Sequence, residues 1–337
     1  MVATTPRVSV LLPVYDGADT LELSLRSIAR QTEPRFECVI LDDGSTDRSL
    51  TIARDQAQRD DRFRVMARPH QGLVATLNAG IEACRAPVVA RMDADDLMHR
   101  DRLAAQLAAL DSFPELSAVG CHVRLFPRAD LTDGLRAYER WLNHIDSPQR
   151  LERDAFVECP IAHPTLCIRQ AVLAKLGYRD QGWPEDYDLV LRLLASGHRL
   201  GVVPRRYLFW RDGPSRLSRT DEAYSDGAFT ACRAHFLAQG MLANRDDYVL
   251  WGFGGTGKAL RKALADHGKH PVAIVELHPG RIGQRIHGAP VIRPEGLSEL
   301  PNIPVLASVA GQPAREEIRA ALAGMGRTEL DDFVCCA

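Results

Sequence analysis

The segment that decides the fold covers residues 87–96 and has the sequence PVVARMDADD. Its first six residues form a short, mostly apolar run, which is typical of a strand buried on both faces of a parallel sheet. Three carboxylates follow within the next four positions. Beyond them Leu103, Leu107 and Leu110 recur at helical spacing, which predicts a helix with one buried side. The segment therefore predicts a strand and a helix joined by an acidic turn.

The same order of strand, polar turn and helix precedes this segment. Strands are expected at 8–14, at 38–41 and near Val65, each followed by a helix. Alternating strands and helices predict a parallel sheet with helices on both faces. Polar turns at 13–16 and 42–45 follow the first two strands. Because ligands bind beyond the carboxyl ends of the strands in such sheets, we expect these two turns and the acidic turn to form one site.

The acidic turn is the clearest sign of chemistry. Asp93, Asp95 and Asp96 would repel one another in a cleft shielded from water. A divalent cation removes this repulsion, and carboxylate oxygens suit Mg²⁺ or Mn²⁺, which also bind phosphates. The alternative is a helix N-terminus stabilised by acidic side chains, although one Asp would suffice for that. We therefore predict a site for Mn²⁺ or Mg²⁺.

Length and composition set the broad class. The chain has 337 residues, about twice the usual size of one domain, so two domains are expected. Hydrophobic residues make up 45% and charged residues 26%, as in soluble globular proteins. With 42 Lys+Arg against 44 Asp+Glu, the net charge of -2 supplies no basic field to hold nucleic acid, so no nucleic-acid partner is expected.

The expected location is the cytoplasm. The first seven residues lack the basic and apolar regions of a signal peptide. No apolar run approaches the roughly 20 residues that a transmembrane segment needs. The eight cysteines are scattered and none falls in a CxxC pair, which favours buried, reduced thiols.

A second unit begins near Tyr248. A strand is expected at 249–251, a helix at 258–267 and another strand at 271–275. This order predicts a small, doubly wound Rossmann-like domain over residues 244–337. The unit resembles the small Rossmann-like domains attached to sugar O-acyltransferases and to some sugar methyltransferases.

The glycine-rich turn of this second unit suggests a nucleotide ligand. Gly252, Gly254 and Gly257 match the G-x-G-x-x-G spacing of dinucleotide-binding turns. Glu276 ends the next strand, near the place where an acid binds the ribose. A P-loop is not expected, because Ala259 replaces the hydroxyl that would bind Mg²⁺. A role in packing or assembly is the alternative to a bound ligand.

Short segments between residues 7 and 220 resemble the successive signatures of family 2 glycosyltransferases. These segments are 8–15, 41–47, 78–80, 90–96, 163–165 and 184–189. The resemblance implies a GT-A fold over residues 1–243 and transfer of a sugar from a nucleotide-diphosphate sugar with inversion of the anomeric centre. The fold class expected for the whole chain is therefore α/β, a GT-A domain followed by a Rossmann-like domain.

The resemblance also implies roles for single residues in donor binding. Pro13 and Tyr15 match the positions that line the nucleobase and the ribose. Asp43 matches the residue that bonds the base, and a carboxylate there would favour uracil or thymine, so a UDP-sugar is expected. Asp93 and Asp95 match the DxD-type element that contacts the ribose and the metal held by the diphosphate.

The candidate catalytic residues lie later in the chain. By resemblance, Asp186 is the general base, with Glu185 beside it. Asp186 would accept a proton from the acceptor hydroxyl, so only one carboxylate base is required. The alternative for Asp186 is the N-cap of a helix at 187–196. His163 is either a substrate-binding residue or a hydrogen-bonded structural histidine.

The chain departs from the family pattern in two places. Relatives often carry an Arg-x-His whose histidine reaches the metal, but the matching stretch 210–218 has no histidine. Many relatives place an Arg before the third motif, where this chain has Leu77. Six arginines lie between Arg199 and Arg219, and Arg211 among them is a candidate substrate residue. These arginines form either a solvated rim or a surface for a diphosphate of the donor or of a lipid-linked acceptor.

The leading hypothesis is a metal-dependent, inverting glycosyltransferase that acts in surface polysaccharide or glycoconjugate synthesis. Its expected partners are a nucleotide-diphosphate sugar and a glycan or lipid-linked acceptor, with contact at the inner face of the membrane. The motifs lie before Arg219, so chemistry is expected to need no residue beyond about 245. One alternative is a sugar-nucleotide-forming nucleotidyltransferase, although the turn at 13–16 lacks the glycine-rich, basic loop of that class. The other alternative is a non-catalytic nucleotide-sensing protein.

Overall fold

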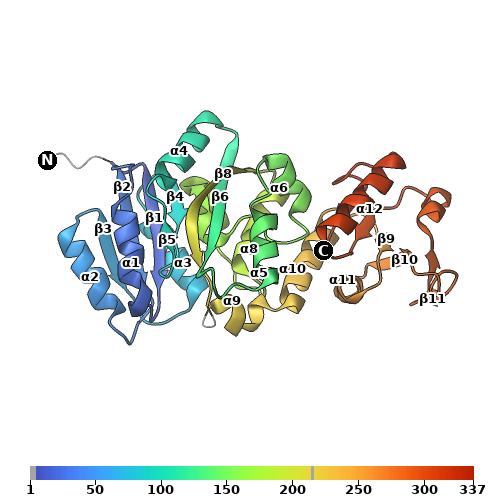
Figure 1. Ribbon diagram of the computed structural model, residues 1–337, viewed down its shortest axis with the longest axis horizontal. Coiled ribbons are helices and arrows are strands. Elements are labelled where there is room, and N and C mark those ends of the chain that lie inside the picture. The colour runs from blue at the N-terminus through green and yellow to red at the C-terminus, as the bar shows by residue number, and fades with distance from the viewer. Residues whose placement is uncertain (1–4, 214–215) are drawn as a thin grey trace. The chain divides into compact units, whose positions relative to one another are not determined.

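The computed structural model describes residues 5–213 and 216–337, and Figure 1 shows its ribbon with many of the elements labelled. The described chain forms two compact units. Most of the first unit comes from the N-terminal half of the chain, and the second unit contains the C-terminal part. The first unit is made of Met1–Leu151, Pro160–Gln181 and Asp188–Arg216, and the second of Glu152–Cys159, Gly182–Tyr187 and Leu217–Ala337. Pro214 and Ser215, within the stretch where the family's Arg-x-His was sought, lie outside the described residues, as do the first four residues of the chain.

The expected alternation of strands and helices is confirmed in the first third of the chain. These elements are β1 Val8–Val14, α1 Ala18–Ala29, β2 Phe36–Asp42, α2 Ser49–Arg59, β3 Phe63–Ala67, α3 Leu73–Ala83, β4 Val88–Arg91 and α4 Arg102–Ser112. Every residue of β1, β2 and β4 is buried, as the apolar runs predict. Leu21, Leu25 and Ile28 of α1 are buried in the same core as these strands.

The sheet of the first unit has the order β3-β2-β1-β4-β7-β6-β8-β5. Its remaining strands are β5 Leu97–Met98, β6 Leu116–Phe126, β7 Cys167–Arg169 and β8 Arg199–Arg211. The strands from β3 to β4 are parallel, but β7 is antiparallel to β4 and β6, and β5 is antiparallel to β8. The parallel sheet predicted from the first strands is therefore confirmed for β3, β2, β1 and β4, and the antiparallel pairs occur where β7 and β5 join the sheet. Exposed residues such as Arg124, Arg205 and Arg206 interrupt the apolar pattern of β6 and β8. For this reason the sequence pattern did not predict either strand.

One glycine explains how α3 packs on this sheet. A Cβ atom at Gly80 would lie 2.2 Å from Cδ1 of Leu11 and 2.8 Å from Cδ1 of Leu41. Glycine therefore lets α3 approach β1 and β2 closely, a contact that no larger side chain would allow without a shift.

Further helices follow in the middle of the chain. They are α5 Asp133–Leu142, α6 Pro148–Asp154, η1 His163–Thr165, α7 Gln170–Leu176, α8 Glu185–Ala195, α9 Leu217–Thr220, η2 Glu222–Tyr224 and α10 Asp226–Gln239. Helix α10 contributes Ala234 and Leu237 to the core of the second unit. Residues before 244 thus belong to the second unit as well. The domain boundary that the sequence predicts at 243–244 stays a prediction.

The second unit contains a second sheet, ordered β11-β12-β10-β9-β13-β14. Its elements are β9 Asp247–Trp251, α11 Gly255–Ala265, β10 His270–Val275, β11 Arg285–Ile286, β12 Ala289–Ile292, η3 Pro294–Glu299, β13 Val305–Ala307, α12 Gln312–Gly324 and β14 Phe333–Cys335. All its strand pairs are parallel except β11–β12. The two strands and the intervening helix that the sequence predicts after Tyr248 are confirmed.

Two expectations from composition bear on the environment of the chain. All eight cysteines are buried free thiols, as expected. In the described part of the chain, none of the helices combines the length and the apolar character that crossing a bilayer requires.

Candidate active site

The three polar turns of the first unit lie at one edge of its sheet. Strands β2, β1 and β4 are adjacent and parallel, so the turns that follow them leave the sheet on the same side. Tyr15, Asp43 and Asp93 each come within two residues of the end of one of these strands. The expected convergence at the carboxyl edge is therefore confirmed.

The first two turns are held together by reciprocal hydrogen bonds. The amide of Asp16 donates to Oγ of Ser45 at 3.0 Å, and the amide of Thr46 donates to Oδ1 of Asp16 at 2.7 Å. The amide of Ala18 donates to Oδ2 of Asp47 at 2.9 Å. Ser, Thr and Asp are the residues that commonly bond loop amides, and these bonds follow that preference. They fix the turn that carries the candidate nucleobase residues.

Asp43 is buried and accepts several hydrogen bonds. Its Oδ1 accepts from the amide of Gln71 at 3.0 Å, and its Oδ2 accepts from the amide of Gly72 at 2.9 Å. Nδ1 of His70 lies 2.9 Å from the same Oδ2. The ring of His70 stacks on Tyr15 with centroids 4.2 Å apart, and half of Tyr15 is exposed. His70 therefore joins two candidate residues and is a site residue that the sequence analysis missed.

Pro13 is placed differently from Tyr15. It lies within β1, where it is buried and pairs in register with Leu41 of β2. Its side chain is thus part of the sheet beneath the turn, and its predicted contact with the nucleobase stays a prediction.

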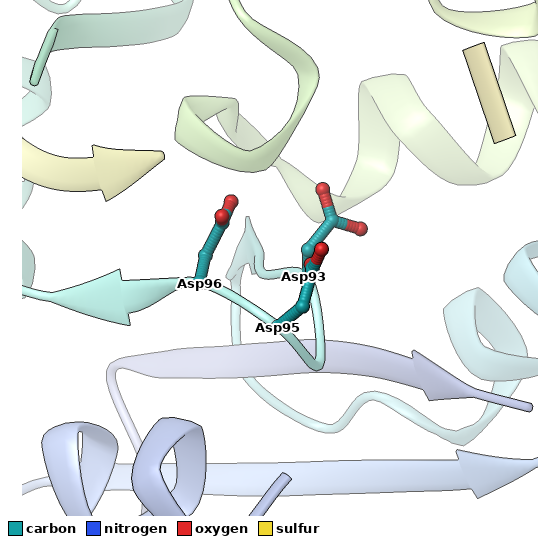
Figure 2. Close-up of side chains that lie close together, drawn as sticks. All are labelled: Asp93, Asp95 and Asp96. Carbon is teal, nitrogen blue, oxygen red and sulfur yellow. The ribbon is translucent and has the colours of Figure 1, made fainter. Parts of the chain in front are cut away.

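Asp93, Asp95 and Asp96 form a compact acidic cluster. Each offers an oxygen atom, and these atoms all lie within 4.8 Å of one another. Figure 2 shows the three side chains projecting to the same side of the turn after β4. Arg91, which is buried at the end of β4, forms an ion pair with Asp93. The family resemblance names only Asp93 and Asp95 as metal-site residues, and the structure places Asp96 beside them.

The electrostatics of this cluster fit a divalent cation. Burial, reinforced by the Asp93 carboxylate, raises the pKa of Asp95 to about 6. Burial also raises the pKa of Asp96 well above its usual range. Oδ2 of Asp96 is buried and has no hydrogen-bond partner among the residues that the structure describes. A cluster of carboxylate oxygens matches the preference of Mg²⁺ and Mn²⁺.

Arg211 holds the acidic turn from the last residue of β8. Its backbone amide donates to Oδ1 of Asp96 at 2.7 Å, and its Nε donates to the carbonyl oxygen of Asp95 at 2.8 Å. Its guanidinium carbon lies 4.5 Å from the ring centroid of Phe126. A second arginine, Arg216, acts electrostatically on Asp95 and tends to lower its pKa, less strongly than burial raises it. The predicted contact of Arg211 with substrate stays a prediction.

His163 is held in a hydrogen-bonded network inside the first unit. It is buried, and its Nε2 lies 2.8 Å from the hydroxyl of Tyr178. The side chain of Asn78 bonds both the amide and the carbonyl of Tyr178, at 2.9 and 3.0 Å. These bonds support the structural alternative for His163, and its contact with substrate stays a prediction.

Glu185 and Asp186 lie in the first turn of α8, in the part of that helix that belongs to the second unit. Oδ1 of Asp186 accepts a hydrogen bond from the amide of Tyr187 at 2.7 Å. Oε2 of Glu185, which is buried, accepts from the hydroxyl of Tyr224 at 2.5 Å. Because α8 begins at Glu185, Asp186 lies inside the helix and is not its N-cap, contrary to that alternative. Its carboxylate nevertheless bonds a first-turn amide, so it serves the same backbone group that a cap would serve.

Residues 9–177 match the family model described as Glycosyl transferase family 2. The chain belongs to this family. The Bacillus subtilis (strain 168) protein named "Putative glycosyltransferase EpsE" is 30% identical over 238 residues, covering 68% of this chain and 82% of its own. The amylovoran biosynthesis glycosyltransferase AmsE of Erwinia amylovora is 29% identical over 215 residues, covering 63% of this chain and 78% of its own.

Two solved structures have the fold of this glycosyltransferase. S. aureus TarS 1-349 in complex with UDP-GlcNAc has a TM-score of 0.52 and 16% identity, over 77% of this chain and 71% of TarS. The mannosyltransferase PcManGT of Pyrobaculum calidifontis, in complex with GDP-Man and Mn²⁺, has a TM-score of 0.51 and 18% identity. It covers 96% of this chain and 82% of its own. The expected GT-A fold is confirmed, and family membership decides against the nucleotidyltransferase and the non-catalytic sensor.

The glycine-rich turn of the glycosyltransferase's second unit is largely explained by packing. Gly252 has φ +94°, and a Cβ there would lie 2.4 Å from Cγ2 of Val309. A Cβ at Gly257 would lie 2.1 Å from the carbonyl oxygen of Gly252. A Cβ at Gly254 would meet no atom within 4 Å. Two of the three predicted glycines thus let the loop and α11 approach closely, as the fold itself requires.

Glu276 bonds the glycine-rich turn directly. Its Oε1 accepts from the amide of Phe253 at 2.8 Å and from Nη1 of Arg281 at 2.9 Å. The carboxylate predicted to bind a ribose is therefore engaged by its own turn. A ligand on Gly252, Gly254, Gly257 and Glu276 stays a prediction.

Proposed function

We propose that this chain is a metal-dependent, inverting glycosyltransferase that moves a sugar from a UDP-sugar to a hydroxyl acceptor. The observation that carries the proposal is the cluster of Asp93, Asp95 and Asp96 at the carboxyl edge of a GT-A sheet. TarS with UDP-GlcNAc and PcManGT with GDP-Man and Mn²⁺ support a nucleotide sugar and a divalent metal as ligands of this fold.

The nucleobase would lie against the turns after β1 and β2. Tyr15 and His70 stack in a pair whose rings are half exposed, which favours stacking of a planar base. Oδ1 of Asp43 accepts one hydrogen bond, from Gln71, and an oxygen of an ionised carboxylate can accept a second. The imide N–H of uracil is a donor of the required kind, which supports UDP over nucleotides whose base presents an acceptor there.

The donor diphosphate would lie over the acidic cluster. Asp93, Asp95 and Asp96 would hold the cation, with Arg211 fixing the turn that carries two of them. When bound, Mn²⁺ or Mg²⁺ supplies positive charge that stabilises the departing diphosphate. Arg91 neutralises part of the charge on Asp93, so the three carboxylates do not face the diphosphate with their full negative charge.

Asp186 is the proposed general base. Its carboxylate would accept the proton of the acceptor hydroxyl as that oxygen attacks the anomeric carbon from the face opposite the diphosphate. The hydrogen bond from the Tyr187 amide holds one carboxylate oxygen of Asp186, and the other oxygen is the one proposed to accept the proton. A single displacement inverts the anomeric centre. It differs from glycoside hydrolysis, in which two carboxyl groups flank the bond.

The proposed acceptor is the hydroxyl of a glycan or of a lipid-linked glycan, in the synthesis of a surface polysaccharide at the inner face of the membrane. The name of AmsE, which assigns it to amylovoran biosynthesis, supports this class of product. Arg205 and Arg206 are exposed on β8, where two positive charges would favour an anionic head group.

A panel of nucleotide sugars tests this function. UDP-GlcNAc, UDP-glucose, UDP-galactose and GDP-mannose are each added to the protein with Mn²⁺ or Mg²⁺, and the rise in melting temperature is measured, since a ligand stabilises the folded state by mass action. Release of the nucleoside diphosphate from the best donor is then followed. We expect a UDP-sugar to give the largest shift, and only with metal. Equal shifts for all nucleotide sugars in a chelator would contradict the proposal.

A further inference from the structure

The second unit contains more than the C-terminal sheet. It also takes in two short segments from earlier in the chain, Glu152–Cys159 and Gly182–Tyr187. The second of these segments carries Asp186, the proposed base. The contacts that hold these segments in the second unit therefore bear on the position of the base.

Tyr187 is the first link to Asp186. Its backbone amide donates to the Asp186 carboxylate at 2.7 Å. Its side chain is fully buried, and the hydroxyl donates to the carbonyl oxygen of Ala155 at 2.8 Å. The ring packs against Phe229 of α10, with centroids 5.7 Å apart. Burial raises the pKa of the hydroxyl, so it stays a neutral donor. Tyr187 thus joins Asp186 to the first of the two segments.

Arg319 of α12 forms an ion pair with Asp154, the residue before Ala155. Its Nη2 donates to Oδ1 of Asp154 at 2.6 Å, and both side chains are buried. Its Nε donates to both carboxylate oxygens of Glu329, and its Nη1 donates to Glu316 at 2.9 Å. All three nitrogens are therefore engaged, and the guanidinium has a defined orientation. Breaking a buried pair by removing one partner leaves an uncompensated buried charge, so Arg319 and Asp154 depend on each other.

A second arginine, Arg233, bonds the backbone of the same segment, Glu152–Cys159. Arg233 of α10 is buried, and its Nη2 donates to the carbonyl oxygen of Val157 at 2.9 Å. The amide of Val157 in turn donates to the carbonyl oxygen of Asp154 at 2.9 Å. The backbone that receives the Tyr187 hydroxyl is thus held on one side by α12 and on the other by α10.

We propose that Arg319 and Tyr187 are positioning residues for Asp186, so the C-terminal region takes part in catalysis by fixing the proposed base. The path runs from Arg319 to Asp154, along the backbone to the Ala155 carbonyl, through the Tyr187 hydroxyl to its amide, and on to Asp186. This inference rests on the proposed role of Asp186. Under this proposal Arg319, which lies beyond residue 245, contributes to turnover. The positions of the motifs alone predict that no residue beyond about 245 is needed.

Hydrogen exchange of the full-length protein tests the path without any substrate. Tyr187→Phe removes only the hydroxyl, and Arg319→Gln removes the ion pair to Asp154. Glu316→Gln is the control, because it removes the charge of another, half-exposed partner of Arg319 but keeps an oxygen that can accept the hydrogen bond from Nη1. We expect amides in the peptide 183–190 to exchange at least 10-fold faster in both test variants and unchanged in the control. Unchanged exchange in Tyr187→Phe, with its fold intact, would overturn the proposal even if Arg319→Gln did not fold.

Turnover shows whether this path acts through the base. With UDP-GlcNAc or GDP-mannose and Mn²⁺, we expect Tyr187→Phe to lower kcat for nucleoside diphosphate release about 10-fold while KM for the donor stays within twofold. In an Asp186→Asn background the same substitution should have no further effect, because a positioning residue has nothing left to position. Additive losses would mean a general structural effect and would overturn the proposal.

These experiments distinguish a wrong assignment of Asp186 as the base from a wrong positioning role for Tyr187. If Asp186→Asn keeps full kcat, the assignment of the base is wrong. If Asp186→Asn lowers kcat but Tyr187→Phe does not, the base stands and the positioning role is wrong.

Discussion

The Nε atom of Arg211 donates a hydrogen bond to the backbone carbonyl oxygen of Asp95, across 2.8 Å. The backbone amide of Arg211 bonds the side chain of Asp96 as well, at 2.7 Å. The last residue of β8 therefore holds two residues of the acidic turn after β4, although 115 positions separate Arg211 from Asp96 in the chain. A strand that carries no acidic ligand of its own thereby shapes the candidate metal site.

We predict that Arg211→Lys weakens Mn²⁺ binding in the presence of UDP by about tenfold. Lysine keeps the positive charge but lacks the planar fork that bonds the Asp95 carbonyl and lies against Phe126. A hydrogen bond from a charged group is worth about 1.5–3 kcal/mol, which corresponds to tenfold or more. Titration calorimetry measures the affinity, and Arg205→Lys on the exposed part of β8 is the control. Equal affinities in wild type and Arg211→Lys would refute a positioning role for Arg211.

Mn²⁺ affinity should depend on pH below about 6. The pKa of Asp95 is raised to about 6 by burial and by Asp93, so below this pH the cation must displace a proton. We expect the affinity to rise about fivefold from pH 5 to pH 6, because one proton of pKa about 6 competes with the cation, and to level off above pH 7. Calorimetry at each pH measures it, and an affinity that stays flat over this range would contradict the assignment of Asp95 as a ligand.

The raised pKa of Asp95 also makes the stability of the folded protein depend on pH. Without metal, folded Asp95 binds a proton more tightly than the same residue in the unfolded chain, where an aspartate has its ordinary pKa of 3.8. The stability contributed by this group is therefore present below about pH 4 and is lost as the pH rises through about 6. Mn²⁺ should restore stability in the range where the carboxylate is charged, and thermal melts with and without Mn²⁺ at pH 7 measure the difference.

Asp186→Asn should lower turnover by about 10²–10⁴, the usual contribution of a general base. Asparagine keeps the size of the side chain and can still accept the hydrogen bond from the Tyr187 amide, but it cannot accept the proton of the acceptor. Affinity for the donor should stay within twofold. The control is Asp180→Asn, an exposed carboxylate nearby in sequence. If donor affinity collapses while turnover persists at saturation, Asp186 is a binding residue and the base lies elsewhere.

Gly257→Ala should destabilise the protein by about 1–3 kcal/mol, as overpacking usually does. The new methyl group would lie 2.1 Å from the carbonyl oxygen of Gly252, and a backbone atom cannot rotate away. Gly255→Ala is the matched control in the same helix turn, because a Cβ there would meet nothing within 4 Å. That control should be neutral or gain up to about 1 kcal/mol from helix propensity. Denaturant midpoints measured by circular dichroism compare them, and equal midpoints would show that the turn adapts.

The first third of the fold could be predicted because its strands are buried on both faces. Continuous apolar runs at β1, β2 and β4, each followed by a polar turn, mark a parallel sheet and its functional edge. Strands β6 and β8 could not be predicted in this way, because exposed residues interrupt their apolar runs. Arg124, Arg205 and Arg206 lie where an apolar run would have been expected.

Some residues of the candidate site could likewise be predicted from the sequence, and others could not. Asp43, Asp93 and Asp95 could be found because they follow strands directly. His70 could not, because it lies in an irregular segment and reaches Asp43 only through tertiary structure. The link from Tyr187 to Ala155 was hidden for the same reason, since it joins positions 32 residues apart.

We expect sugar transfer to require a divalent cation held by the acidic cluster of Asp93, Asp95 and Asp96. The most direct test measures release of nucleoside diphosphate at saturating donor for wild type with Mn²⁺, for wild type in excess chelator, and for Asp95→Ala with Mn²⁺. We predict full turnover in the first case and the same small residual rate in the other two, with the fold of Asp95→Ala intact by circular dichroism. Turnover by Asp95→Ala at the wild-type rate, or turnover by wild type that survives the chelator, would contradict the claim.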